Sequence, residues 1–158
     1  MTFAYHRSLS PMLAVFLGLA VTEMCVVHLV VVAAWGWHAA LIFGAIDFSL
    51  VVALIGLIRS LRRLPILIED GRLTLRAGNL KTVTIRIDQI AGFREQWDGP
   101  AIKRRDLLNL ALLAWPNIVI DLKEPVPAGR RRVVAIAHKL DEPAAFHVAM
   151  AALRPRDD

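Results

Sequence analysis

Three ionisable side chains lie well inside the two long apolar runs near the start of the chain: Glu23, His28 and Asp47. Such groups are costly at the centre of a bilayer, and they usually face protein, water or one another. They can relay protons, bind a metal or haem, or hydrogen-bond a neighbouring helix. One histidine and two carboxylates make a poor metal site unless a second chain doubles the set. We therefore predict no metal and no cofactor, and a metal- or haem-binding membrane subunit that uses His28 stays as an alternative.

The sequence lacks the motifs of the common catalytic sites. It has no GxSxG, HExxH or GxxxxGK[ST] pattern and no GxGxxG after an expected strand. His138 and His147 are isolated, as surface or capping residues are, and Trp97 and Trp115 are expected to pack on a sheet. A site for single-stranded nucleic acid would need aromatic and basic residues interleaved on one strand face, and the sequence has no such pattern. It therefore indicates a protein that is not an enzyme and binds no nucleic acid.

Two long apolar runs carry the ionisable residues, with only the residues around Gly36 between them. A helix of about 20 apolar residues crosses a bilayer core of roughly 30 Å. A spanning segment must also satisfy its backbone groups internally, so both runs should be helical. We therefore expect a transmembrane hairpin of two helices, at about 11–35 and 38–58, joined by a tight turn.

This hairpin predicts how the ionisable residues are placed. Glu23 lies thirteen residues before Gly36 and Asp47 eleven residues after it, so their depths differ by about 3 Å at roughly 1.5 Å per residue. His28 is about 140° round the helix from Glu23, and the two cannot share one face. We expect Glu23 and Asp47 to meet between the helices and His28 to face a second chain, either a copy of this protein or another membrane protein. The same groups could instead be neutral and only hydrogen-bond the two helices.

Positive charge is concentrated after the hairpin, in a chain whose net charge is +5. The turn contains no Lys or Arg, whereas arginines follow the second helix, so the positive-inside rule places both termini in the cytoplasm. The first apolar run is too long for a signal peptide and has no convincing cleavage site. The Arg- and Ala-rich composition fits a GC-rich bacterial genome, so we expect the hairpin to lie in the inner membrane of a bacterium. Three basic clusters are expected to face anionic lipid or an acidic partner: Arg59/Arg62/Arg63, Lys103/Arg104/Arg105 and Arg130/Arg131/Arg132.

From Pro65 onward the apolar pattern changes from helical to alternating. An Asp70-Gly71 turn joins two expected strands, and Val83, Ile85 and Ile87 share one face of the next strand, as in an antiparallel sheet with one buried side. A final helix, capped by Asp141, carries an apolar stripe that could cover a sheet. The expected strands lie in residues 65–70, 72–78, 81–90 and 91–98, in a segment that ends near Trp115-Pro116, and in 117–122 and 133–140, with a loop over 124–132.

The hairpin, the basic stretch with proline, and the segments LTLRAG, VTIRIDQI, PNIVIDL and DEPAAFHVAM resemble bacterial membrane proteins with a pleckstrin-homology-like (PH-like) domain. The resemblance implies an α+β fold in which an antiparallel β-sandwich or barrel of about seven strands is capped by a C-terminal helix. It divides the chain into a transmembrane hairpin, 1–63, and a cytoplasmic PH-like domain, 64–158. Members with assigned roles are mostly scaffolds or assembly factors at membranes.

Together these features predict a non-catalytic accessory protein that scaffolds or helps to assemble a membrane protein complex. Polar groups on more than one face of a membrane helix need neighbours, and a small antiparallel sheet offers an edge that a peptide strand could extend. The alternative is a sensor of the anionic lipid surface without a protein client.

Overall fold

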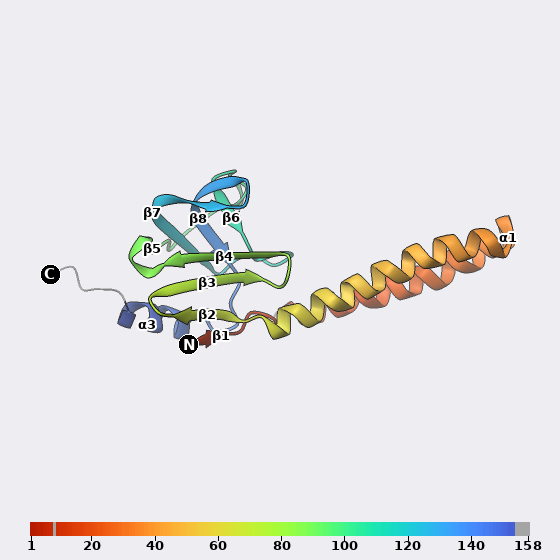
Figure 1. Ribbon diagram of the computed structural model, residues 1–158, viewed down its shortest axis with the longest axis horizontal. Coiled ribbons are helices and arrows are strands. Elements are labelled where there is room, and N and C mark those ends of the chain that lie inside the picture. Colours follow the sequence, from red (N-terminus) through yellow and green to blue (C-terminus); the bar gives the residue numbers. More distant parts are fainter. Residues whose placement is uncertain (8, 154–158) are drawn as a thin grey trace.

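A long helical projection and a β-rich body make up the computed structural model, which describes residues 1–7 and 9–153 (Figure 1). The body contains two four-stranded sheets and a C-terminal helix, so the predicted α+β class is confirmed. In chain order the elements are β1 (Thr2–Phe3), α1 (Ser10–Arg63), β2 (Ile66–Glu69), β3 (Arg72–Ala77), β4 (Lys81–Arg86), the 3-10 helix η1 (Ile87–Gln89), β5 (Ile90–Phe93), α2 (Gly99–Ile102), β6 (Leu107–Asn109), β7 (Ile118–Ala128), β8 (Arg131–His138) and α3 (Pro143–Leu153).

The projection is one helical element, α1, interrupted at Gly36. The backbone there has φ 79° and ψ 176°, a region that glycine enters and other residues essentially do not. A Cβ built on Gly44 would lie 3.2 Å from Nδ1 of His28, although sixteen residues of straight helix would separate these positions by about 24 Å. The first arm (residues 10–35) and the second arm (residues 37–63) therefore run side by side (Figure 1).

The prediction of a hairpin of two separate helices, 11–35 and 38–58, is wrong in that form. Gly36 alone changes the chain direction, so no turn separates two helix ends, and the second arm continues to Arg63. Arginine and leucine favour the helical conformation, and Arg62 and Arg63 complement the negative end of the helix dipole. The element ends at Arg63 because Pro65 disfavours the helical conformation at Leu64, the residue before it.

The first sheet has the strand order β1-β2-β3-β4. β2, β3 and β4 form the antiparallel meander that their alternation predicts, and Asp70 and Gly71 both have positive φ in the turn between β2 and β3. Val83 and Ile85 are buried as predicted. The start of the chain adds β1 to β2, with Thr2 paired to Leu67, so the first residues of the chain belong to the sheet that follows α1.

The second sheet has the order β5-β7-β8-β6. β6 pairs with β8 in parallel, and the described residues form no closed barrel. The predicted antiparallel sandwich or barrel of about seven strands is therefore corrected to two four-stranded sheets, one of which contains a parallel pair. The predicted loop over 124–132 is also corrected, because β7 continues to Ala128 past a register shift between Asp121 and Val126. The bulge lets the strand bend without ending the pairing.

One hydrophobic core joins both sheets to α3 and to the base of α1. Phe146 and Met150 of α3 are fully buried in it, as the apolar stripe predicts, whereas Leu153 is exposed. Asp141, expected as a helix cap, accepts a hydrogen bond from the backbone N–H of Arg7 at 3.0 Å. The residues of α1 that pack against this core lie in its first and last turns: Met12, Leu13, Leu54, Leu57, Ile58 and Leu61.

Candidate functional site

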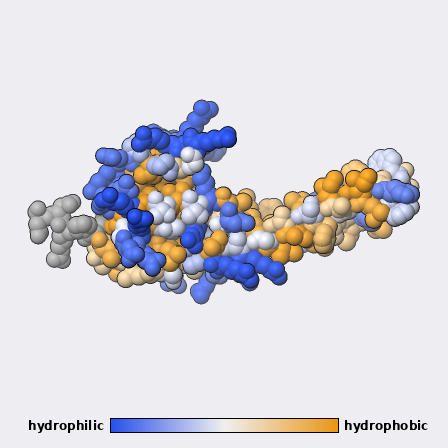
Figure 2. All heavy atoms as spheres, viewed as in Figure 1, coloured by the Kyte–Doolittle hydropathy of each residue, from blue (hydrophilic) through white to orange (hydrophobic). Residues whose placement is uncertain are grey.

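The surface of α1 beyond its base is apolar and uncovered. By length and composition the element can cross a membrane, and the same test is passed by a signal sequence or by the core helix of a soluble protein. A core helix is mostly buried, whereas no part of the most apolar window of α1 is buried. Figure 2 shows apolar side chains along the projection and a hydrophilic tip. The exposed large apolar residues of α1 include Val15, Phe16, Leu19, Val26, Leu29, Val30, Leu41, Ile42, Phe43, Ile46, Phe48, Leu50 and Val52.

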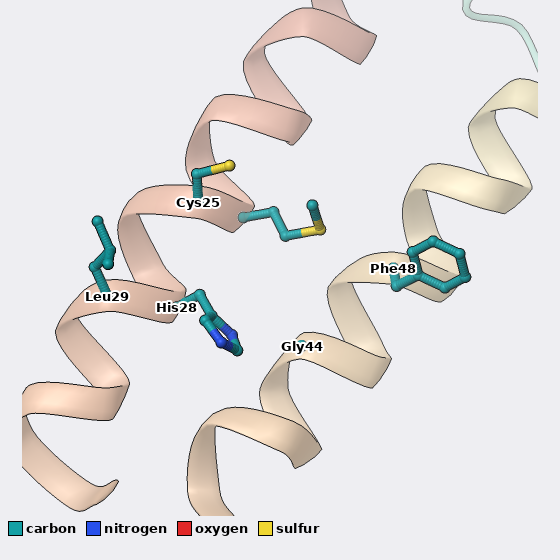
Figure 3. Close-up of a pocket in the computed structure, with 6 residues that line it drawn as sticks. Cys25, His28, Leu29, Gly44 and Phe48 are labelled. Carbon is teal, nitrogen blue, oxygen red and sulfur yellow. The ribbon is translucent and has the colours of Figure 1, made fainter. Parts of the chain in front are cut away.

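His28 lies half-buried between the two arms. Its ring points from the first arm toward Gly44 on the second (Figure 3). Gly44 makes this approach possible, because the added Cβ of any other residue would crowd the imidazole. The ring borders a groove of about 480 Å³ whose other lining residues are Met24, Cys25, Leu29, Gly44 and Phe48.

The predicted arrangement of the ionisable residues is corrected by these positions. His28 contacts the second arm of its own chain, where a second chain was expected, and Glu23 is exposed. Asp47 is half-buried, and within the described part of the chain no hydrogen bond or ion pair joins it to Glu23 or His28. The described residues also contain no group of three or more His, Cys, Asp or Glu that could hold a metal ion. Glu23, His28 and Asp47 can accept or donate hydrogen bonds within the apolar surface of α1.

The basic clusters occupy two parts of the surface. Arg59, Arg62 and Arg63 are exposed at the base of α1. The other two clusters, distant in sequence, come together because β6 follows the first of them and pairs with β8, which begins in the second. Their meeting point is a hollow of about 490 Å³ lined by Arg105, Asp106, Arg131 and Arg132, which we call the arginine hollow.

The net charge of the arginine hollow is positive. Arg104 forms a two-pronged contact with Asp106, with Nη2 to Oδ2 at 2.6 Å. The hydrogen bond from Arg104 lowers the pKa of the Asp106 carboxyl, so this carboxylate stays ionised and its charge is balanced. Arg132 donates to the carbonyl of Pro125 at 3.2 Å. The remaining cations suit an anionic group such as a phosphate or a carboxylate.

The buried side chain of Tyr5 ties the end of α1 to the body. The Tyr5 hydroxyl donates to the carbonyl of Leu64 at 3.0 Å and accepts from the N–H of Gly78 at 2.8 Å. Tyr5 is fully buried, and this burial raises the pKa of its phenol. Its ring packs edge-on against His138, with ring centroids 5.0 Å apart.

His138 is fully buried, contrary to its predicted surface or capping position. Its Nδ1 accepts from the N–H of Lys139 at 2.8 Å, which leaves Nε2 to donate to the carbonyl of Arg76 at 2.8 Å. Burial lowers the pKa of this imidazole, and the backbone carbonyls oppose the shift. His138 is a structural link between β8 and β3, and its neutral form is the one that this site favours.

The two tryptophans of the body behave differently. Trp97 packs on the second sheet beside Val119, Ala135 and Ala137, as predicted. The prediction was wrong for Trp115, whose exposed fraction is 60%. No signal in the sequence separates the two, because each lies at the end of a strand candidate. The chain matches no known protein family, no curated protein and no solved structure.

Proposed function

We propose that this chain is a non-catalytic, membrane-anchored accessory protein that scaffolds or helps to assemble a membrane protein complex. The observation that carries the proposal is Glu23, a carboxyl group exposed on the apolar surface of α1. A carboxyl group that faces lipid near the bilayer centre is costly. A second membrane helix that hydrogen-bonds Glu23 removes this cost, and it also covers apolar surface of the first arm.

The dimensions of α1 support a membrane anchor. The arms are free of the body core between Leu13 and Gly36 and between Gly36 and Leu54. These free segments are about 33 Å and 26 Å long at roughly 1.5 Å per residue. The first is slightly longer and the second slightly shorter than a bilayer core of roughly 30 Å. The tip carries Trp35 and Trp37, which suit a membrane–water interface.

The charge at the two ends of α1 supports an orientation. Arg59, Arg62 and Arg63 lie at the base, and the residues around Gly36 include no Lys or Arg. By the positive-inside rule the body is cytoplasmic and the tip is on the opposite side, which for a bacterial protein means the inner membrane. The two sheets with a C-terminal helix are compatible with a PH-like domain in the body, and this assignment is part of the proposal.

A second candidate function is that of a sensor of anionic lipid, and the arginine hollow favours it. Three arginines around one hollow provide the fork-shaped donors that bind phosphate groups. In this case the body reads the lipid surface and α1 serves only as an anchor. The two functions differ in whether a protein partner contacts α1.

Co-purification from native membranes tests the first function. Tagged chains with Glu23→Leu and with Thr22→Leu are compared with the natural chain after mild crosslinking. Thr22 is a matched control, because it is also exposed and polar but donates its hydroxyl proton to the carbonyl of Gly18 at 3.0 Å. We expect a membrane partner that is lost with Glu23→Leu and kept with Thr22→Leu. Recovery of the natural chain alone, without a partner or a second copy, contradicts the proposal.

A further inference from the structure

Three large apolar side chains stand out from the body in segments that lie close to α1. Leu80 is 60% exposed, Leu113 is 58% exposed and Trp115 is 60% exposed. Leu80 belongs to the β3–β4 turn, and the other two belong to the connection between β6 and β7. Both segments lie on the side of the body that faces α1 (Figure 1).

The β3–β4 turn is held directly against the base of α1. The N–H of Asn79 donates to Oγ of Ser60 at 3.1 Å, and a Cβ built on Gly78 would lie 2.5 Å from the same oxygen. The N–H of Gly78 also donates to the hydroxyl of Tyr5. These contacts fix Leu80 at the level where the second arm leaves the body.

The β6–β7 connection is anchored at the same end of the body. Leu112 and Ala114 pack against the core, and Leu112 has a φ of +55°, which a leucine rarely adopts. Asn117 exchanges side-chain hydrogen bonds with the backbone of Leu140 at 2.8 Å. The connection is thus fixed on both sides of its exposed residues, and Leu113 and Trp115 are displayed on a supported loop.

This end of the second sheet is joined to the turn beside α1. The backbone N–H of Asn117 donates to the carbonyl of His138 at 3.0 Å, and Nε2 of His138 donates to the carbonyl of Arg76. Arg76 lies two residues before Gly78. The chain of contacts therefore runs from the loop that carries Trp115 to the turn that carries Leu80.

We propose that Leu80, Leu113 and Trp115 form an interfacial anchor that inserts into the membrane leaflet from which α1 emerges. The inference rests on the proposed membrane insertion of α1, because that insertion places the bilayer surface at this end of the body. Tryptophan prefers the headgroup level, and leucine gains from contact with acyl chains. Arg59, Arg62 and Arg63 at the base of α1 complement anionic headgroups beside them.

The interfacial anchor gives the body one fixed face toward the membrane. The base of α1 already packs into the body core without a linker, and three inserted side chains add contacts to one side of that base. The body is then held against the leaflet, and its opposite side stays free for a partner. Attachment by α1 alone would leave these three apolar side chains in water.

Depth-dependent quenching tests the interfacial anchor in the full chain. Cys25 is replaced by serine, and a single cysteine is introduced by Leu113→Cys, by Val148→Cys or by Val30→Cys. Each variant is labelled with an environment-sensitive fluorophore and reconstituted into vesicles of phosphatidylethanolamine and phosphatidylglycerol that contain lipids brominated at known depths. Val148 is the matched control, because it is an exposed apolar residue on α3 with an exposed fraction of 72%.

We expect shallow bromine to quench the label at position 113 several-fold more than the label at 148. Deep bromine should quench the label at 30. If the label at 30 is quenched and those at 113 and 148 are equally unquenched, the interfacial anchor is wrong and membrane insertion of α1 stands. Equal quenching at 113 and 148 also overturns it, because contact is then not specific to this face. If the label at 30 is not quenched, the proposed membrane function fails together with the anchor.

Discussion

Replacement of Tyr5 by phenylalanine should loosen the junction between α1 and the body. The ring stays, because Tyr5 is fully buried and phenylalanine fills nearly the same volume. The change removes the hydroxyl that accepts from the N–H of Gly78 at 2.8 Å and donates to the carbonyl of Leu64 at 3.0 Å. A buried group left without its partner costs roughly 1–3 kcal/mol.

The effect can be measured as a thermal transition of the full chain in mild detergent, followed by near-UV circular dichroism. For a chain of this length, about 1–3 kcal/mol corresponds to a decrease of roughly 2–12 °C in the transition temperature. Thr74→Val is the control, because it removes an exposed hydroxyl that contacts the hydroxyl of Thr84 at 3.1 Å. An exposed change of this kind should alter stability by less than about 0.5 kcal/mol. If Tyr5→Phe and Thr74→Val shift the transition equally, the reasoning is refuted.

Three further predictions concern other parts of the body. The pKa of His138 is lowered in the folded state, so the unfolded state binds more protons. The free energy of unfolding should therefore decrease as the pH falls below about 6.5, by up to about 1.4 kcal/mol per pH unit. Denaturant titrations at several pH values should show this slope, and His138→Gln should flatten it. Gly78→Ala should lower the transition temperature, because its φ is +55° and the new Cβ meets Ser60, whereas Gly92→Ala, with open space, should change it little. Arg131→Ala should weaken the binding of inorganic phosphate to the detergent-solubilised chain at low salt if the arginine hollow binds phosphate, and unchanged, salt-insensitive binding would contradict that role.

Strands β2, β3 and β4 of the first sheet were predictable because local patterns determine them. Alternating residues such as Val83 and Ile85 specify which face is buried, and an Asp-Gly pair specifies the turn. β1 was missed because two residues contain no periodicity, and the pairing partner of Thr2 lies beyond the whole of α1. The burial of Tyr5 follows from that pairing and could not be predicted separately.

The sequence names Glu23, His28 and Asp47 as ionisable residues of α1, but their geometry could not be predicted from it. α1 is apolar around its whole circumference, so its sequence has no polar face that shows which side meets the other arm. The close approach of His28 to Gly44 shows which side of the first arm meets the second, and this approach depends on packing. The arginine hollow was missed for a similar reason, because the parallel pairing of β6 with β8 joins segments that no local pattern relates. Leu113 and Trp115 were likewise expected in a strand that packs on the sheet.

Site-specific photocrosslinking in native membranes tests whether a membrane protein covers α1 at Glu23. A photoreactive residue is placed at Val26, which lies within one helical turn of Glu23 and is 54% exposed, so that Glu23 itself is kept. Leu29, which is 71% exposed about 120° round the helix from Glu23, receives the same probe as a comparison. We expect position 26 to crosslink to a membrane protein, identified by mass spectrometry, and this product to disappear when Glu23→Leu is added. Crosslinks from position 26 to lipid only, with no protein product above that from position 29, would contradict the account.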